Sequence, residues 1–129
     1  KTTSSNSKNE KANAETDVSF SGDLGDVTLD TSGTNQNITL FFQNTGLRTL
    51  DESTLSIFVD GNPATILRSA IYPNNGVWAT NYVIEIVVSE AAWNYVDTDL
   101  VIVTAVVKST VSGGTSGTDS VTEEVRLSV

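Results

Sequence analysis

The sequence contains no cysteine and no histidine in its 129 residues. Without cysteine, neither a disulfide bond nor a thiolate metal site can form. Without histidine, the commonest general base of enzymes and the commonest zinc ligand are both missing. Nucleophilic catalysis is further disfavoured because the sequence has no G-x-S-x-G motif. We therefore expect a protein that is not an enzyme and that carries no cofactor and no metal.

Positive charge is also scarce. The sequence has seven lysine and arginine residues and sixteen aspartate and glutamate residues, which gives a net charge of −9. A nucleic acid would be repelled, because its binding depends on neutralising phosphates with basic side chains. No stretch approaches the roughly 20 consecutive apolar residues of a membrane-spanning helix.

Large apolar residues are absent from residues 1–16, which are rich in serine, asparagine and lysine. Such a segment buries too little surface to offset its ordering entropy, so we predict a flexible polar linker. Because the first residue is lysine and the segment is polar, we interpret it as the part that follows a removed N-terminal membrane anchor. The linker holds three basic and two acidic residues, so the acidity belongs to residues 17–129.

Alternating apolar and polar residues organise the stretch from 37 to 61. Ile38, Leu40 and Phe42 share one parity, which is the pattern of a strand with one buried face. Asn44, Thr45 and Gly46 then break the pattern with residues that favour a reversal. A second alternating run ends at Asp60 and Gly61, the dipeptide best suited to a two-residue hairpin turn.

Short β-type runs of the same kind recur along the rest of the chain. They predict further strands at 18–20, 27–29, 64–70, 82–88, 100–107 and 121–129. Hardly any segment has the period of a helix. The sequence therefore predicts an all-β domain over residues 17–129, an immunoglobulin-like antiparallel β-sandwich of about seven to eight strands, with a small barrel as the alternative.

Carboxylates gather at two places in the sequence, Asp23 with Asp26 and Asp30, and Asp97 with Asp99. Spaced carboxylates can bind calcium, but neither group matches the D-x-[DN]-x-[DN]-G loop of an EF-hand. A pair of carboxylates can also serve a glycosidase, yet no other feature of the sequence indicates a cleft. We predict solvated turns at both places.

Two further features could concern carbohydrate. Asn37 begins the only N-x-[ST] triplet, a possible acceptor for N-glycosylation if its side chain faces solvent. Four aromatic residues could stack against sugars or, as we prefer, fill the ends of a sandwich. They are Trp78, Tyr82, Trp93 and Tyr95.

Residues 100–107 are apolar on both faces, which is unusual for an antiparallel sandwich strand. Residues 82–88 are nearly as apolar. If the two strands are neighbours, their outer side chains combine into an exposed patch of the kind that marks partner surfaces. The alternative is that a loop covers these side chains. We predict a self-association surface made of Val83, Val87, Val101, Val103 and Val107.

The strand–NTG–strand–DG unit resembles one known family. Phe42-Gln43-Asn44-Thr45-Gly46 and Val59-Asp60-Gly61, together with the polar leader and the acidic all-β domain, are similar to the soluble domains of archaellum accessory proteins of the flagellar F and G type. The matching residues cover about a fifth of the chain. A similar pattern also occurs in archaellin outer domains and in adhesion modules of cell-surface proteins.

The resemblance implies a role without catalysis. In that family an N-terminal hydrophobic helix anchors the chain in the cytoplasmic membrane of an archaeal cell, and the β-sandwich lies outside the membrane. The domain then holds the archaellum motor to the envelope by binding S-layer protein, by forming a homodimer or larger assembly, or both. The alternatives are an adhesin or carbohydrate-binding module, and the outer domain of an archaellin or pilin.

Overall fold

The computed structural model describes residues 10–129, and nearly all of its regular structure is β-strand. The expected all-β class is confirmed. The strands are β1 Val18–Phe20, β2 Val27–Asp30, β3 Asn37–Asn44, β4 Leu50–Val59, β5 Asn62–Tyr72, β6 Val83–Ser89, β7 Leu100–Ser109 and β8 Thr118–Ser128.

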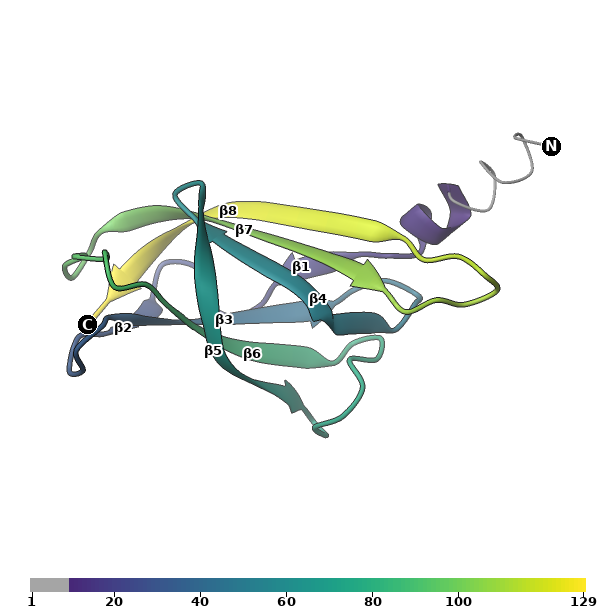
Figure 1. Cartoon of the computed structure of the whole chain (residues 1–129), viewed down its shortest axis with the longest axis horizontal. Coiled ribbons are helices and arrows are strands. Elements are labelled where there is room, and N and C mark those ends of the chain that lie inside the picture. Colours follow the sequence, from purple (N-terminus) through teal and green to yellow (C-terminus); the bar gives the residue numbers. More distant parts are fainter. Residues whose placement is uncertain (1–9) are drawn as a thin grey trace.

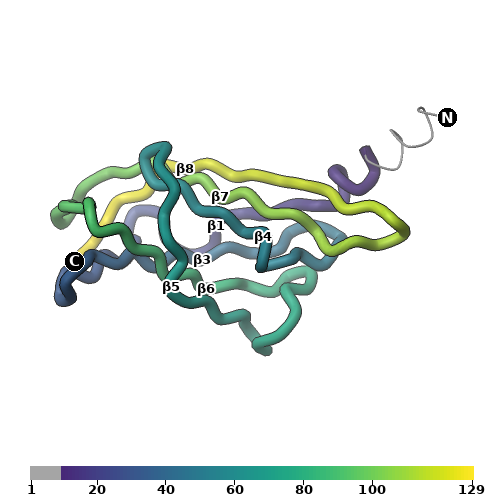
Figure 2. The backbone as a smooth tube through the Cα atoms, viewed as in Figure 1, coloured from purple at the N-terminus to yellow at the C-terminus, as the bar shows by residue number. Residues whose placement is uncertain are grey.

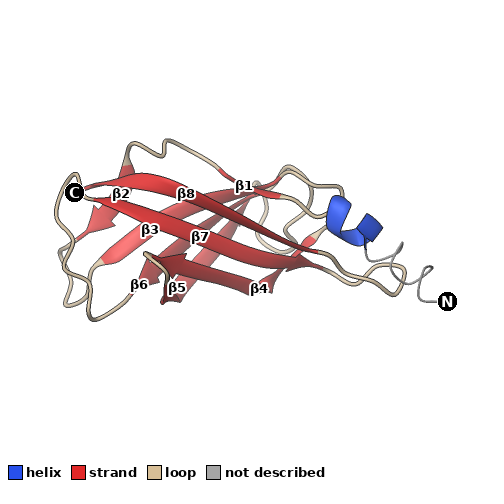
Figure 3. Ribbon diagram, turned by 90° about the horizontal axis from the view of Figure 1, so that it is seen from above, coloured by secondary structure: helices blue, strands red, loops and turns tan. Residues whose placement is uncertain are grey.

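The strands form one sheet that closes into a seven-stranded barrel. Hydrogen-bonded neighbours follow the order β3-β2-β8-β7-β4-β5-β6, and β6 pairs again with β3 to complete the ring. The short strand β1 pairs with β3 beside β2. Every ladder is antiparallel except that between β2 and β8. The barrel has two walls, β3–β6–β5 and β4–β7–β8, which are seen from above in Figure 3.

The core lies between these walls and follows the predicted alternation. Ile38, Leu40 and Phe42 of β3 are buried, as are Ile84, Ile86 and Val88 of β6, while the odd-numbered residues of β7 fill the interior from the opposite side. Burial of such side chains is the main stabilising contribution to a domain of this size. The wall containing β3 and β6 therefore packs against the wall containing β7 through aliphatic side chains.

The two ends of the barrel carry different features. A helical segment at 10–14 and the β7–β8 connection lie at one end, and the C-terminus lies at the opposite end (Figures 1 and 2). In residues 10–129, no helix is long and apolar enough to cross a membrane.

The predicted linker needs a correction at its second half. Residues 1–9 lie outside the described part of the chain, but residues 10–16 pack on the barrel, where Ala12 and Thr16 are buried. Composition missed this contact because the segment has no large apolar side chain to bury. Its backbone and small side chains make the contact instead.

Candidate functional site

The five predicted interface valines do not form one surface. Strand β7 pairs with β4 and β8, whereas β6 pairs with β3 and β5, so β6 and β7 lie in different walls. Val101, Val103 and Val107 point into the core and are at most 1% exposed. This part of the prediction is wrong, because alternation in a strand that is apolar on both faces does not reveal which face lies inside.

Val83 and Val87 lie on the outer side of β6, opposite to the core residues of that strand. Val83 is half-buried there, and Val87 is covered, with Arg68 of β5 and Thr39 of β3 opposite it in the two ladders. The exposed apolar side of β7 has the other parity and consists of Leu100 and Ile102.

Aromatic side chains surround Val83 on this wall. Tyr72 is the ladder partner of Val83 in β5, and Phe41 of β3 is the partner of the adjacent outward residue, Glu85. Tyr72 is 50% exposed and Phe41 is 36% exposed. We call this surface, made of the outward residues of β6 and their ladder partners, the outer β6 face; its members are Thr39, Phe41, Gln43, Arg68, Ala70, Tyr72, Val83, Glu85 and Val87.

Glu85 and Arg68 are the charged members of the outer β6 face. The Tyr72 hydroxyl donates a hydrogen bond of 3.1 Å to Glu85 Oε1. That bond and the carboxylate charge raise the pKa of Tyr72. The face thus has aromatic and aliphatic side chains around Glu85, with Arg68 beside Val87.

The outer side of β7 is aliphatic, and charged residues flank it. Leu100 lies opposite Arg126 of β8, and Ile102 lies opposite Glu124. Both charged residues are exposed. The outer β6 face also has two charged residues but adds the exposed aromatic side chains of Phe41 and Tyr72, which makes it the better candidate for a protein contact.

Asn44 and Gly46 of the NTG loop are buried, and the loop holds the N-terminal segment. Asn44 is 0% exposed, and its Nδ2 donates to the carbonyl oxygens of Arg48 at 2.8 Å and Trp78 at 3.0 Å. Its Oδ1 accepts from the Gly46 N–H at 3.0 Å. The Asn44 amide therefore satisfies three backbone groups in the interior, which stabilises the loop conformation.

Two glycines allow the N-terminal segment to approach closely. A Cβ on Gly46 would lie 2.6 Å from the Glu15 carbonyl oxygen, and one on Gly117 would lie 2.2 Å from the Ala12 carbonyl oxygen. The Leu47 N–H donates to Glu15 O at 2.8 Å. We call these contacts, between residues 12–17 and the loops at 44–48 and 112–117, the N-terminal dock.

Arg48 joins three parts of the N-terminal dock. Its Nε forms an ion pair with Glu15 Oε1 at 3.0 Å, and its Nη1 donates to the Thr115 carbonyl oxygen at 2.9 Å. Both charged side chains are largely shielded from solvent, which strengthens the pair relative to an exposed one. The sequence pattern singled out Asn44, Thr45 and Gly46 but gave no signal for Arg48 or Gly117.

The predicted DG turn is confirmed at the other end of the barrel. Val59 pairs with Asn62, and Asp60 and Gly61 have φ angles of 52° and 83°, as a two-residue type I′ turn requires. The Asp60 carboxylate accepts bonds from the Ile102 N–H at 2.8 Å and the Tyr95 hydroxyl at 3.0 Å. Burial, followed by the bond to Asp60, raises the pKa of Tyr95 to about 12.

The acidic groups act as local acceptors for backbone N–H groups. Asp23 accepts from Gly25, Asp30 from Ser32 and Asp99 from Val96, each at 2.8–2.9 Å. In residues 10–129, no three acidic side chains converge in a way that could hold a metal ion. These carboxylates stabilise turns, as short polar side chains commonly do.

The aromatic residues lie at both ends instead of forming a platform. Trp78 is 1% exposed and donates from Nε1 to the Tyr82 carbonyl oxygen at 2.9 Å, near the N-terminal dock. Trp93 and Tyr95 pack against each other at 5.9 Å between ring centroids, near the DG turn. Asn37 is half-buried in β3, which pairs on both sides at this residue, and its glycosylation stays a prediction.

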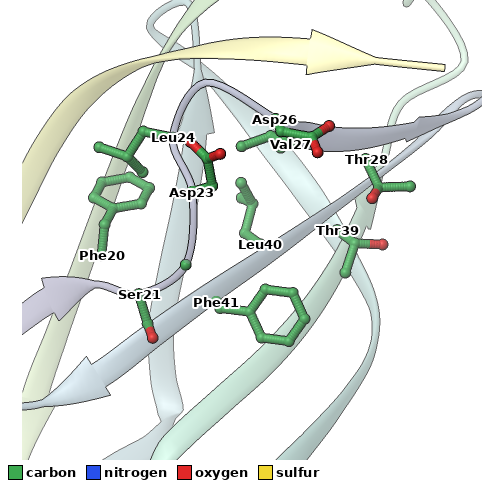
Figure 4. A pocket seen from close by; sticks show the side chains of 11 residues that line it. Phe20, Ser21, Asp23, Leu24, Asp26, Val27, Thr28, Thr39, Leu40 and Phe41 are labelled. Carbon is green, nitrogen blue, oxygen red and sulfur yellow. The ribbon is translucent and has the colours of Figure 1, made fainter.

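A small pocket lies beneath the β1–β2 connection. Figure 4 shows the side chains of Phe20, Leu24, Leu40 and Phe41 around it, with Asp23 and Asp26 at one side. Its volume is about 110 Å³. Small-molecule sites usually have volumes of roughly 300–1,000 Å³, so this pocket suits at most a single side chain of a partner.

No protein-family model matches the chain, and no curated protein sequence matches it either.

Proposed function

We propose that this domain is a non-enzymatic binding module of a cell envelope and that it uses the outer β6 face to associate with its own copies or with a second protein. The observation that supports this proposal most is that two aromatic side chains, Phe41 and Tyr72, are exposed beside the half-buried Val83. Exposed aromatic residues beside shielded aliphatic ones are the composition favoured in protein interfaces.

The finer fold is part of the proposal. An immunoglobulin-like sandwich is supported by the division of the ladders into two walls, which β2 and β5 join at the edges. Residues 62–64 of strand β5 pair with β4, and the strand then pairs with β6 from Thr65 onward. Strands that change sheets in this way are compatible with a sandwich whose edges are closed.

The biological role follows the resemblance of residues 42–46 and 59–61 to archaellum accessory proteins of the F and G type. In this proposal the domain lies outside the cytoplasmic membrane of an archaeal cell and holds the archaellum motor to the envelope through S-layer protein, through self-association, or both. The N-terminal dock supports such a role, because it fixes the direction in which residues 10–17 leave the barrel. A domain that transmits force benefits from a rigid attachment.

A Val83→Lys substitution tests the proposal. Val83 is half-buried on the outer side of its strand, so lysine can extend into solvent in the monomer but places an unpaired charge in an interface. We expect sedimentation velocity to show dimers or larger species for the natural sequence and monomers for the variant. Co-sedimentation with isolated S-layer sheets should fall at least tenfold if the same face binds them.

Ile102→Lys is the matched control on the opposite wall, where Ile102 is 42% exposed. It adds the same charge to an outer aliphatic position of β7. If Ile102→Lys abolishes association while Val83→Lys leaves it intact, the binding surface lies on β7 and the outer β6 face is the wrong choice. If the natural sequence is monomeric at high concentration and does not co-sediment with S-layer sheets, the proposed binding function is contradicted.

A further inference from the structure

The two short strands beside β3 leave a gap along its edge. Strand β1 pairs with residues 42–44 of β3, and β2 pairs with residues 37 and 38. Within residues 10–129, positions 39–41 of β3 therefore have no ladder partner on this side, although the Ser21 N–H donates to the Phe41 carbonyl oxygen at 2.9 Å. The pocket of Figure 4 lies in this gap, between β3 and the β1–β2 connection at residues 21–26.

Hydrogen bonds fix the shape of the β1–β2 connection. Asp23 Oδ1 accepts from the Gly25 N–H at 2.8 Å, and the Asp23 carbonyl oxygen accepts from the Asp26 N–H at 3.1 Å. The Leu24 carbonyl oxygen accepts from the Arg126 N–H of β8 at 2.8 Å. The pocket is therefore formed before any partner arrives, and binding does not have to order its walls.

The inside of the pocket is apolar. Val27 and Leu40, which line it, belong to the hydrophobic core, and Phe20 and Leu24 are half-buried around it. Its volume of about 110 Å³ admits one extended side chain. An aliphatic chain that displaces water from these side chains gains hydrophobic stabilisation.

Two carboxylates lie at one side of the pocket. Asp23 and Asp26 are both exposed, and Figure 4 shows them along the β1–β2 connection. In residues 10–129 the one ion pair is that of Arg48 with Glu15, so no basic side chain neutralises either aspartate. A wholly apolar side chain of a partner would leave these carboxylates poorly solvated in an interface, whereas a cation would compensate their charge.

The pocket adjoins the outer β6 face. Thr39 and Phe41 belong to both, because they line the pocket and are the ladder partners of Val87 and Glu85. A protein that covers the outer β6 face therefore also reaches the pocket. It can place one side chain there as part of the same contact.

We propose that this pocket receives a lysine or arginine side chain of a partner protein that covers the outer β6 face. The aliphatic part of that side chain packs against Phe20, Leu24 and Leu40, and its charged group lies beside Asp23 and Asp26. A basic protein is a better match than a second copy of this chain, whose net charge is −9. This inference rests on the proposed function, because it names the chemistry of the partner at the same face.

Two blocked amino acids test the pocket directly. Nα-acetyl-lysine methylamide carries the proposed side chain, and Nα-acetyl-norleucine methylamide has the same aliphatic chain without the ammonium group. At low ionic strength we expect the lysine compound, at millimolar concentration, to shift the nuclear magnetic resonance signals of the Gly25 amide and of the Leu24 and Leu40 methyl groups. The norleucine compound should bind about fivefold more weakly, and added salt should narrow the difference.

An Asp26→Asn variant removes one charge from the pocket and keeps the shape of the side chain. Asp26 is the better choice for this test because the Asp23 carboxylate also bonds to Gly25. We expect the affinity for the lysine compound to fall about threefold. Glu52→Gln is the matched control, since it removes one exposed charge from β4 in the opposite wall, and it should leave the affinity unchanged.

An Asp26→Lys variant extends the test to a partner protein. The position is exposed, so lysine is tolerated in the monomer, but its charge repels a basic side chain at the pocket. Co-sedimentation with isolated S-layer sheets should fall about tenfold, whereas Glu52→Lys should co-sediment as the natural sequence does. If Asp26→Lys co-sediments normally while Val83→Lys does not, the outer β6 face binds the partner and this inference is wrong.

Failure of the proposed function gives a different result. The natural sequence then does not co-sediment with the sheets, while the titration with the two compounds still decides whether the pocket selects a cation. Three results of that titration would overturn the inference. One is equal affinity for the lysine and norleucine compounds, and another is a set of shifts spread over all acidic positions of the chain. The third is a shift of the same signals with protein concentration alone, because the occupant would then be a second copy.

Discussion

The two ends of the barrel both carry a turn with a recognisable sequence, but the turns differ in what holds them. At the Asp60–Gly61 end, two residues with positive φ join β4 and β5, and the turn is exposed. At the Asn44–Gly46 end, the Asn44 amide is fully buried and three backbone groups depend on it. Both turns bond to distant segments, but the bonds of Asp60 are exposed to solvent, whereas those of Asn44 are buried.

Similar turn residues can therefore contribute differently to the free energy of unfolding. An exposed turn exchanges its hydrogen bonds with water, so each bond contributes little to stability. A buried amide leaves its partners without water when it is removed, which costs about 1–3 kcal/mol for each unsatisfied group. Substitutions at the end that carries the N-terminal dock should therefore lower the free energy of unfolding more than substitutions at the Asp60–Gly61 end.

The largest effect is expected from Asn44→Ala. The variant leaves the Arg48 and Trp78 carbonyl oxygens and the Gly46 N–H without their partner. We expect the free energy of unfolding to fall by about 3–5 kcal/mol, measured by chemical denaturation. Asp60→Asn, which removes the charge at the exposed end and keeps a side chain that tolerates positive φ, should cost about 1 kcal/mol. Equal losses for the two variants would remove the distinction between the ends.

A smaller effect is expected from Gly117→Ala, which sharpens the comparison by testing the dock alone. The new Cβ would lie 2.2 Å from the Ala12 carbonyl oxygen, so residues 12–17 must move away. We expect a loss of about 2–3 kcal/mol and faster hydrogen exchange of the Leu47 N–H, which donates to Glu15.

Gly33→Ala is the control for that experiment, because a Cβ there meets its nearest atom at an ordinary 3.6 Å. It should leave both the free energy of unfolding and the Leu47 exchange rate almost unchanged. If the Leu47 N–H of the Gly117→Ala variant exchanges as slowly as in the natural sequence, residues 12–17 stay in place. Gly117 is then not needed for their close approach.

The smallest effect concerns Tyr95 at the hairpin end. Its pKa is raised to about 12 by burial and by its bond to Asp60. The folded state thus holds the phenol proton more tightly than the unfolded state, whose pKa is about 10. The resulting stabilisation is present below pH 10 and is lost as the pH rises toward 12.

Spectrophotometric titration of the phenol checks this effect. In the Asp60→Asn variant the charge is lost while the turn residue still tolerates positive φ, so the Tyr95 pKa should move down toward 10. The chain has two other tyrosines, so a background with Tyr72→Phe and Tyr82→Phe isolates the signal. An unchanged Tyr95 pKa in the Asp60→Asn variant would mean that the bond to Asp60 does not contribute, which leaves burial and the charge of Asp99 as causes.

The sequence predicted the strands well because their signals are local. Alternation at Ile38, Leu40 and Phe42 identified the buried face of β3, and the Asp60–Gly61 pair identified a hairpin with its register. The same reasoning failed for β7, where residues on both faces are apolar. There it assigned Val101, Val103 and Val107 to the surface, although they fill the core.

By itself, the sequence determined an acidic, all-β domain and the position of its best turns, because charge, period and positive φ depend on neighbouring residues along the chain. Only the tertiary structure decided that β6 and β7 lie in different walls, and that Gly46 and Gly117 allow residues 12–17 to pack on the barrel. These features depend on strand order and on contacts between segments far apart in the sequence, and no local pattern records them.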